Sequence, residues 1–165
     1  MDALTAIATR HSTRSFTSKP LSRADLESIV NAGRAAPSAR NEQQWEFVVV
    51  ADAATRRRIA ELTGGGGSFI AEAPACIAIF SKPTKYYLED GCLAAGTMLV
   101  AAAALGIQSC WVAGDKKPYA DAIKTLLFAP DDYKLVSMIA LGYSDAQPQI
   151  STKRPLNEVL HWERF

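Results

Sequence analysis

The chain has 165 residues, 48% of them hydrophobic and 21% charged, which fits one folded domain over residues 1–165 and excludes a largely disordered chain. Its formal net charge of +1 gives no signal for nucleic acid or an acidic membrane as the main partner. Three cysteines without a CxxC pair and two distant histidines indicate reduced thiols in a cytoplasmic protein and no metal site. Cys76 and Cys110 lie in apolar segments and are expected in the core.

The first half of the chain is predicted to form short helices around one buried strand. The expected elements, in chain order, are a helix over residues 2–9, a helix over 22–33, a polar loop over 34–44, a strand over 45–51 and a helix that follows residue 52. Asp2 and Asp52 stand where they can cap the first and third helices, and Ser22 opens the second with a variant of the capping box. Gly33 is expected to end that second helix, because glycine tolerates the left-handed conformation after a helix end.

Four consecutive glycines, 64–67, invite interpretation as a phosphate-binding loop. The run lacks the GK[ST] ending, and it leads towards a strand instead of from a strand into a helix. A flexible loop is therefore the prediction for this segment.

The second half adds three strands and a long helix. The expected elements are a strand over 75–81, a helix over 86–105, a strand over 108–113, a helix over 119–128, a strand over 135–143 and one helical turn within 155–160. The long helix is rich in Ala and Gly and short for a membrane span, so a buried helix that its neighbours approach closely is predicted, and no membrane partner. Because helices and strands do not alternate regularly, the order favours an α+β sandwich around one sheet over a doubly wound fold.

The first polar cluster is the segment Arg10-His11-Ser12-Thr13-Arg14, directly after the N-terminal helix. Its two guanidinium groups and two hydroxyls are suited to binding a phosphate. If the segment is extended, Arg10, Ser12 and Arg14 point to the same side and converge on one anion. A basic surface loop is the alternative that composition alone allows.

Two further clusters suit a flat heterocycle. The segment 37–45 carries neutral amides and a hydroxyl, which can hydrogen-bond an edge that both donates and accepts, with an ordinary polar turn as the alternative. A strand that ends at Gly114 allows backbone to approach a flat ligand closely, and Lys153 and Arg154 add late anion donors. No side chain has the pattern of a dedicated nucleophile.

Four motifs occur in a fixed order along the chain: RHSTRSF, APSARNEQQW, LGIQSCWVAG after the Ala-rich helix, and KRPLNEVLHWERF at the end. Together they resemble the FMN-dependent nitroreductase family over essentially the whole chain. The resemblance implies an α+β sandwich with a central, mainly antiparallel sheet of four to five strands flanked by helices. It also implies an intertwined homodimer with FMN at the subunit interface, in which the helix over 93–104 packs centrally and Trp162 and Phe165 embrace the partner.

The resemblance further implies a set of flavin-binding positions. They are Arg10, His11, Ser12, Arg14, Pro37, Ser38, Asn41, Gln43, Val112, Ala113, Gly114, Lys153 and Arg154. Arg10 and Ser12 would hold the phosphate and the ribityl chain. Arg14 would lie toward the N1–C2 carbonyl side of the ring, where its charge can tune the flavin. His11 stands in the same segment and either contacts the cofactor or packs there.

The other matched segments have distinct roles in the family. By this resemblance, the loop over 37–43 would reach FMN from the other subunit, the backbone of 112–114 would lie near the flavin ring, and the pair 153–154 would contact the phosphate. Gln44 departs from the pattern, because family members usually carry Pro before the Trp.

The activity that the resemblance implies is a ping-pong reductase, in which NAD(P)H reduces FMN and a small electron acceptor, such as a nitroaromatic or a quinone, then takes its place. No catalytic side chain is expected beyond the flavin. One alternative is a flavoenzyme of the same fold with different chemistry, such as reductive dehalogenation or flavin destruction. The other is a non-catalytic flavin-binding or dimeric interaction protein. A Rossmann protein lacks support, because no GxGxxG follows a first strand.

Overall fold

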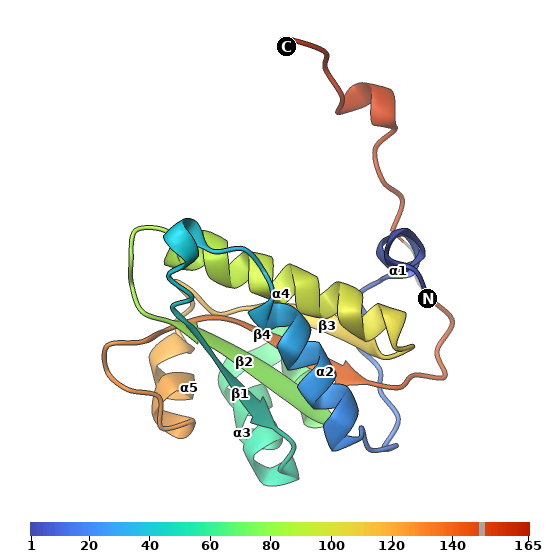
Figure 1. Ribbon diagram of the computed structural model, residues 1–165. Coiled ribbons are helices and arrows are strands. Elements are labelled where there is room, and N and C mark those ends of the chain that lie inside the picture. Colours follow the sequence, from blue (N-terminus) through green and yellow to red (C-terminus); the bar gives the residue numbers. More distant parts are fainter. Residues whose placement is uncertain (149–150) are drawn as a thin grey trace.

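The centre of the fold is a four-stranded sheet, in a computed structural model that describes residues 1–148 and 151–165 (Figure 1). The strands are β1 (Trp45–Val50), β2 (Ala75–Ser81), β3 (Gln108–Ala113) and β4 (Lys134–Gly142), in the spatial order β1-β2-β4-β3. Every pairing is antiparallel, and the central strands β2 and β4 are almost wholly buried, with Ile77 opposite Ile139. The predicted antiparallel sheet of four to five strands is confirmed.

Helices cover both faces of this sheet. They are α2 (Arg23–Arg34), α3 (Ala53–Thr63), α4 (Tyr87–Ala104) and α5 (Ala120–Leu126), while α1 (Ala3–Thr9) lies against α4. Because successive residues of a strand face opposite sides, Ile77 and Ile79 of β2 pack with α2 and α4. Cys76 and Ala78 pack on the other face, with α3 and α5 (Figure 1). The predicted α+β sandwich is confirmed, and so is the burial of Cys76.

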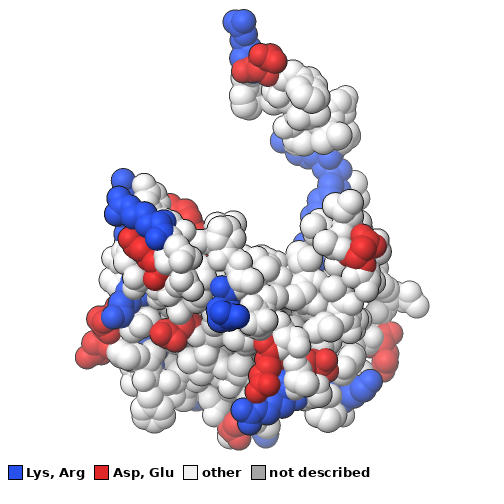
Figure 2. Space-filling model, in the orientation of Figure 1, with Lys and Arg blue, Asp and Glu red and all other residues white. Residues whose placement is uncertain are grey.

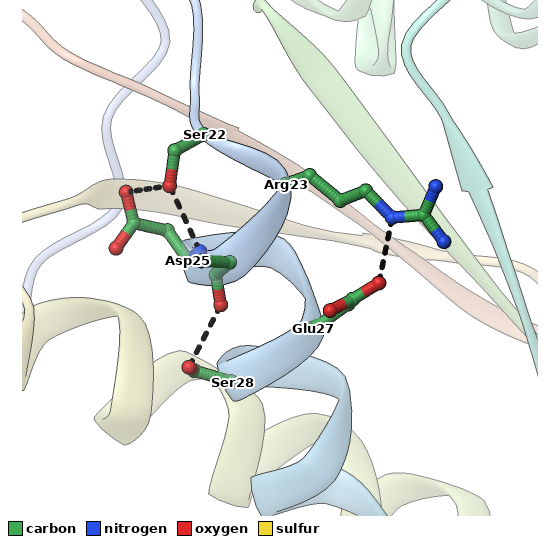
Figure 3. Close-up of polar contacts among 6 residues, drawn as sticks. Ser22, Arg23, Asp25, Glu27 and Ser28 are labelled. Atoms are coloured by element: carbon green, nitrogen blue, oxygen red, sulfur yellow. Dashed lines mark hydrogen bonds and ion pairs between the residues drawn. The ribbon is translucent and has the colours of Figure 1, made fainter.

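The starts of α1, α2 and α3 fall where local capping predicts. Asp2, Ser22 and Asp52 each accept a hydrogen bond from the backbone N–H of the residue three positions on, at 3.1, 3.0 and 2.7 Å. Figure 3 shows the start of α2, where the Ser22 hydroxyl also donates to the Asp25 carboxylate at 2.7 Å. The other predicted elements agree with the structure to within a few residues at their ends.

Gly33 does not end α2, so that prediction is wrong. It is buried inside the helix, which continues to Arg34 and has its cap at Ala35. A Cβ atom at Gly33 would overlap the side chain of Met98 on α4. The glycine therefore permits the close approach of α2 and α4, two helices that are distant from each other in sequence.

The glycine run, which was predicted as a flexible loop, forms part of two defined turns. Two consecutive 3₁₀ turns, Gly64–Gly66 and Ser68–Ala71, continue from the end of α3. A Cβ atom at Gly67 would collide with the side chain of Thr63, so the turns need a glycine there. The second turn places Phe69 in the core beneath the sheet.

Apolar surface remains exposed at both ends of the chain. The C-terminal tail, residues 151–165, leaves the body (Figure 1), and all of its residues are exposed, including Trp162 at 79% and Phe165 completely. Leu4 on α1 is also 79% exposed. Surface of this kind usually marks a contact with another molecule. Across residues 1–148 and 151–165, no helix is both long and apolar enough to cross a membrane.

Candidate functional site

The segment 10–14 runs extended along the edge of β3. Ser12 forms a parallel bridge with Ser109, and the Thr13 N–H donates to the Ser109 carbonyl at 3.0 Å. The side chain of Thr13 is buried, whereas those of Ser12 and Arg14 are exposed. The alternation on which the phosphate prediction depends is therefore present.

Ser12 and Arg14 line a cavity of about 250 Å³ beside this segment. Its other lining residues are His11, Thr13, Ser15, Ser144, Ala146 and Gln147. No carboxylate is among these described residues, and Thr13 Oγ1 is buried without a hydrogen-bond partner in the described part of the chain. A cavity lined by a guanidinium, an imidazole and hydroxyls, without an acid, suits an anionic group.

Arg10 lines a second cavity, of about 300 Å³, which shares His11 with the first. Both arginines affect the pKa of Cys110, a buried residue of β3. Burial raises the pKa of the Cys110 thiol, while Arg14, then Ser12 and Arg10, act to lower it. Ser12 and Arg14 thus line one cavity and Arg10 lines the adjoining one, and His11 belongs to both.

Phe69 supports Arg14 from the second 3₁₀ turn. The guanidinium carbon of Arg14 lies 5.9 Å from the centroid of the Phe69 ring. A cation within about 6 Å of an aromatic face is attracted to it. The glycine run thus contributes to the site through Phe69, a contact that the sequence analysis missed because no motif connects the two residues.

The loop over 37–43 has an unusual backbone. Arg40, Asn41 and Gln43 have φ values of 54°, 57° and 51°, in the left-handed region. The Ser38 hydroxyl accepts a hydrogen bond from the Gln43 N–H at 3.1 Å, and the Asp90 carboxylate accepts one from the Ala39 N–H at 3.0 Å. The predicted contact residues of this loop are exposed, except Ser38, which is half-buried. Asp90 was not recognised in the sequence analysis.

Within one chain, this loop and the segment 10–14 do not meet. The loop is bound to Asp90 near the start of α4, whereas the cavity beside Arg10 includes Ala103 near its end. At a rise of about 1.5 Å per residue, these two positions lie about 20 Å apart along the helix. The structure therefore places two of the predicted flavin-binding groups at opposite ends of α4.

The strand end at 112–114 packs against β4. The middle residue is half-buried and its two neighbours are buried. The Gly114 N–H donates to the Val136 carbonyl at 3.1 Å, and a Cβ atom at Gly114 would lie 2.7 Å from Leu135 Cγ. Packing within the chain is thus sufficient to explain this glycine, without the approach of a ligand.

A tyrosine and a carboxylate meet beside the same strand end. The Tyr87 hydroxyl, at the start of α4, donates to Asp115 Oδ1 at 2.8 Å. Burial, followed by the hydrogen bond to Asp115 and the charge of that residue, raises the pKa of Tyr87 to about 12. Tyr87 is therefore a neutral donor at ordinary pH and holds the Asp115 carboxylate next to Gly114. No sequence motif connects these residues, and Asp115 was missed.

Lys153 and Arg154 lie on the exposed tail, and neither lines the cavities beside the segment 10–14. Arg154 donates to the Glu158 carbonyl at 2.9 Å, and its Nε lies 3.4 Å from the Glu158 carboxylate. Figure 2 shows Lys and Arg side chains at the base of the tail, outside the body of the chain.

Comparison with known proteins connects this geometry to one family. The family model described as "Nitroreductase family" matches residues 7–70 and 63–143. That region includes the segment 10–14, the loop over 37–43 and the strand end at 112–114, and it stops before the tail.

Individual relatives cover nearly the whole chain. A protein of Archaeoglobus fulgidus named "Putative NADH dehydrogenase/NAD(P)H nitroreductase" is 33% identical over 149 residues, which cover 86% of this chain and 85% of the relative. An NADPH-flavin oxidoreductase of Vibrio harveyi is 23% identical over 180 residues, covering 99% of this chain and 75% of the relative. The structure of an FMN-dependent nitroreductase from Clostridium difficile R20291 superposes with a TM-score of 0.90 at 27% identity, covering 98% of this chain and 99% of the other.

Proposed function

The chain belongs to the nitroreductase family and is an oxidoreductase, and we propose that it binds FMN and transfers electrons from NAD(P)H to a small acceptor such as a nitroaromatic or a quinone. The observation that carries this proposal is the segment 10–14. It presents two guanidinium groups and hydroxyls to two adjoining cavities that no described carboxylate lines. The likeness to a protein named as an FMN-dependent nitroreductase supports the same cofactor.

The residues present fit the phosphate end of FMN. Guanidinium forks bind two phosphate oxygens at once, so Arg10 and Ser12 are the proposed phosphate and ribityl contacts. Arg14 would place a positive charge at the N1–C2 side of the ring, where negative charge develops, and its contact with the Phe69 ring would help to hold that guanidinium in position. Bound FMN supplies the redox chemistry, a two-electron transfer from NAD(P)H to the acceptor in ping-pong order. The chain's own residues bind and orient, and none acts as a nucleophile.

The proposed active form is a homodimer. The exposed apolar side chains of the tail and of α1 provide surface for a second copy. If the α4 helices of two copies lie antiparallel, the loop over 37–43 of one copy comes beside the segment 10–14 of the other. Each FMN would then contact both copies, at Pro37, Ser38, Asn41 and Gln43 of one and at the segment 10–14 of the other. The tail would cross to the second copy and add Lys153 and Arg154 to the phosphate contacts.

A visible absorption spectrum tests the cofactor. The purified protein should show flavin bands, and heat release followed by filtration should yield FMN at about one per chain. Steady-state oxidation of NADH and NADPH with a quinone and with a nitroaromatic acceptor then tests turnover. A colourless protein that fails to take up added FMN contradicts the proposal, and a flavin-loaded protein that oxidises neither nucleotide contradicts the reductase assignment.

Mixed dimers test the composite site. One subunit carries Arg10→Ala, and the other carries Asn41→Ala together with Gln43→Ala. If each FMN contacts both copies, the mixed dimer has one doubly altered site and one intact site, so about half of the wild-type flavin occupancy should return. If each chain binds FMN alone, both sites of the mixed dimer stay defective, and the composite site is wrong.

A further inference from the structure

Asp90 is a buried carboxylate with one oxygen in use. It lies in the first turn of α4 and is only 4% exposed. Its Oδ1 accepts the Ala39 N–H at 3.0 Å, while its Oδ2 is buried and has no hydrogen-bond partner in residues 1–148 and 151–165. A buried carboxylate is unfavourable unless its interactions offset the loss of water. An apolar side chain at this position would fill the core at a lower cost in free energy, so the contact with Ala39 indicates a specific role for Asp90.

That contact holds a loop with a strained backbone. Three non-glycine residues of the loop over 37–43 have positive φ, and such residues persist only when their surroundings fix them. The remaining hydrogen bonds of this loop, among the residues that the structure describes, join it to itself, as between Ser38 and Gln43. The Asp90 carboxylate is thus the single hydrogen-bonded connection there from the loop to another element.

Apolar packing on α4 fixes the base of the loop. Ala36 and Trp45, which flank the loop, form a small buried cluster with Ala94 of α4. Ala94 lies one helical turn after Asp90, so the same helix supports the base by apolar contact and the tip by a hydrogen bond. Removal of the carboxylate would leave this apolar contact in place and take away the hydrogen bond to the Ala39 N–H.

We propose that Asp90 is a positioning residue that holds the loop over 37–43 in the conformation that contacts FMN. The proposal rests on the proposed function, in which Ser38, Asn41 and Gln43 contact flavin. A pre-shaped loop binds its ligand more tightly because the cost of ordering is met before binding. Asp90 acts through the Ala39 N–H and does not itself touch the cofactor.

The test compares variants at Asp90 in the full-length protein. Asp90→Ala removes the acceptor, whereas Asp90→Asn keeps a side-chain oxygen that can accept the Ala39 N–H. Glu89→Ala is the matched control, because it removes a carboxylate from an exposed neighbour in the same helical turn. FMN dissociation constants come from titration of the flavin-free protein, followed by flavin fluorescence. We expect Asp90→Ala to bind FMN about tenfold more weakly or worse, and Asp90→Asn and Glu89→Ala to stay within about threefold of wild type.

Amide hydrogen exchange of Ala39, measured by NMR without FMN, gives a readout that does not depend on the cofactor. Exchange should become faster in Asp90→Ala and remain slow in Asp90→Asn and Glu89→Ala. If circular dichroism shows that Asp90→Ala does not fold, Asp90→Leu takes its place, since a buried carboxylate can often be replaced by an apolar side chain of similar volume.

The outcomes separate this inference from the proposed function. Wild-type FMN affinity in a folded Asp90→Ala or Asp90→Leu protein overturns the role of Asp90 and leaves the flavin assignment intact. Equal losses in Asp90→Asn and Asp90→Ala also overturn it, because a positioning acceptor should be rescued by the amide oxygen. Failure of the wild-type protein to bind FMN refutes the proposed function, and the flavin role of Asp90 with it.

Discussion

Replacement of Arg10 by alanine is the sharpest test of the phosphate site. Arg10 is half-buried beside β3, and its guanidinium makes no hydrogen bond or ion pair with any residue in 1–148 or 151–165. A cation held in this way is available for an external anion. The substitution should therefore weaken FMN binding without much effect on the fold.

The size of the effect follows from the chemistry of the contact. A hydrogen bond to a charged group contributes about 1.5–3 kcal/mol, which corresponds to about 10- to 150-fold in the FMN dissociation constant. Because Arg10 has no described side-chain partner to leave unpaired, the free energy of unfolding of the flavin-free protein should change by no more than about 0.5 kcal/mol. Arg10→Lys should fall between wild type and Arg10→Ala, because it keeps the charge and loses the planar fork.

The assay is titration of flavin-free protein with FMN, in parallel with urea denaturation. Arg57→Ala is the control, since Arg57 is an exposed arginine on α3 whose Nε donates only to the carbonyl of Ala53, at 3.2 Å. Its loss removes the same charge from another face and should leave FMN binding unchanged. An Arg10→Ala protein with wild-type FMN affinity, or one that weakens no more than Arg57→Ala, refutes the assignment of the phosphate to this segment.

Three further predictions concern the frame of the site. Gly33→Ala should lower the free energy of unfolding by about 1–2 kcal/mol, because overlap with Met98 outweighs the gain in helix propensity; urea denaturation measures it, and a neutral result would show that Met98 moves aside. The wild-type protein should lose stability from about pH 10 to 12 through Tyr87, since the unfolded side chain titrates near 10 and the folded one near 12. Tyr87→Phe lacks this loss, so the gap between their urea midpoints should narrow as pH rises from 9 to 12, and a constant gap would contradict the raised pKa. Deletion of residues 151–165 should give a monomer with weak FMN binding in sedimentation and titration experiments, and a stable, fully flavinated dimer would remove the proposed role of the tail.

Features of the fold that depend on neighbours in sequence were predictable. Asp2, Ser22 and Asp52 cap their helices because a side-chain oxygen reaches a backbone N–H three residues on, and that geometry needs no tertiary contact. The buried strand β2 was recognisable because its apolar run is bounded by turn-forming residues. The role of Gly33 was predicted wrongly because its neighbour Met98 is distant in sequence. From the sequence alone, a glycine inside a helix cannot be told from a glycine that follows the end of a helix.

The candidate site was likewise predictable only where its residues are neighbours in sequence. The segment 10–14 was recognised because its candidate phosphate-binding groups are adjacent in sequence, and in the structure the segment lies beside β3 through the bridge between Ser12 and Ser109. Asp90 was missed because its partner Ala39 is far away in sequence and offers only a backbone N–H, which has no residue signature. Phe69 was missed because an aromatic residue after a glycine run is ordinarily part of the core. Its contact with Arg14 depends on how the two 3₁₀ turns are placed.

Both parts of the proposed flavin site lie beside helix α4. Asp90 near its start holds the loop over 37–43, and Ala103 near its end lines the cavity beside Arg10. In the proposed dimer, the separation of about 20 Å would give each chain two half-sites that belong to different flavins. An antiparallel pair of α4 helices places the start of one against the end of the other, which turns four half-sites into two complete ones. On this reasoning, pairing of the chains and binding of FMN stabilise each other, so the dimer should dissociate at lower protein concentration once the flavin is removed.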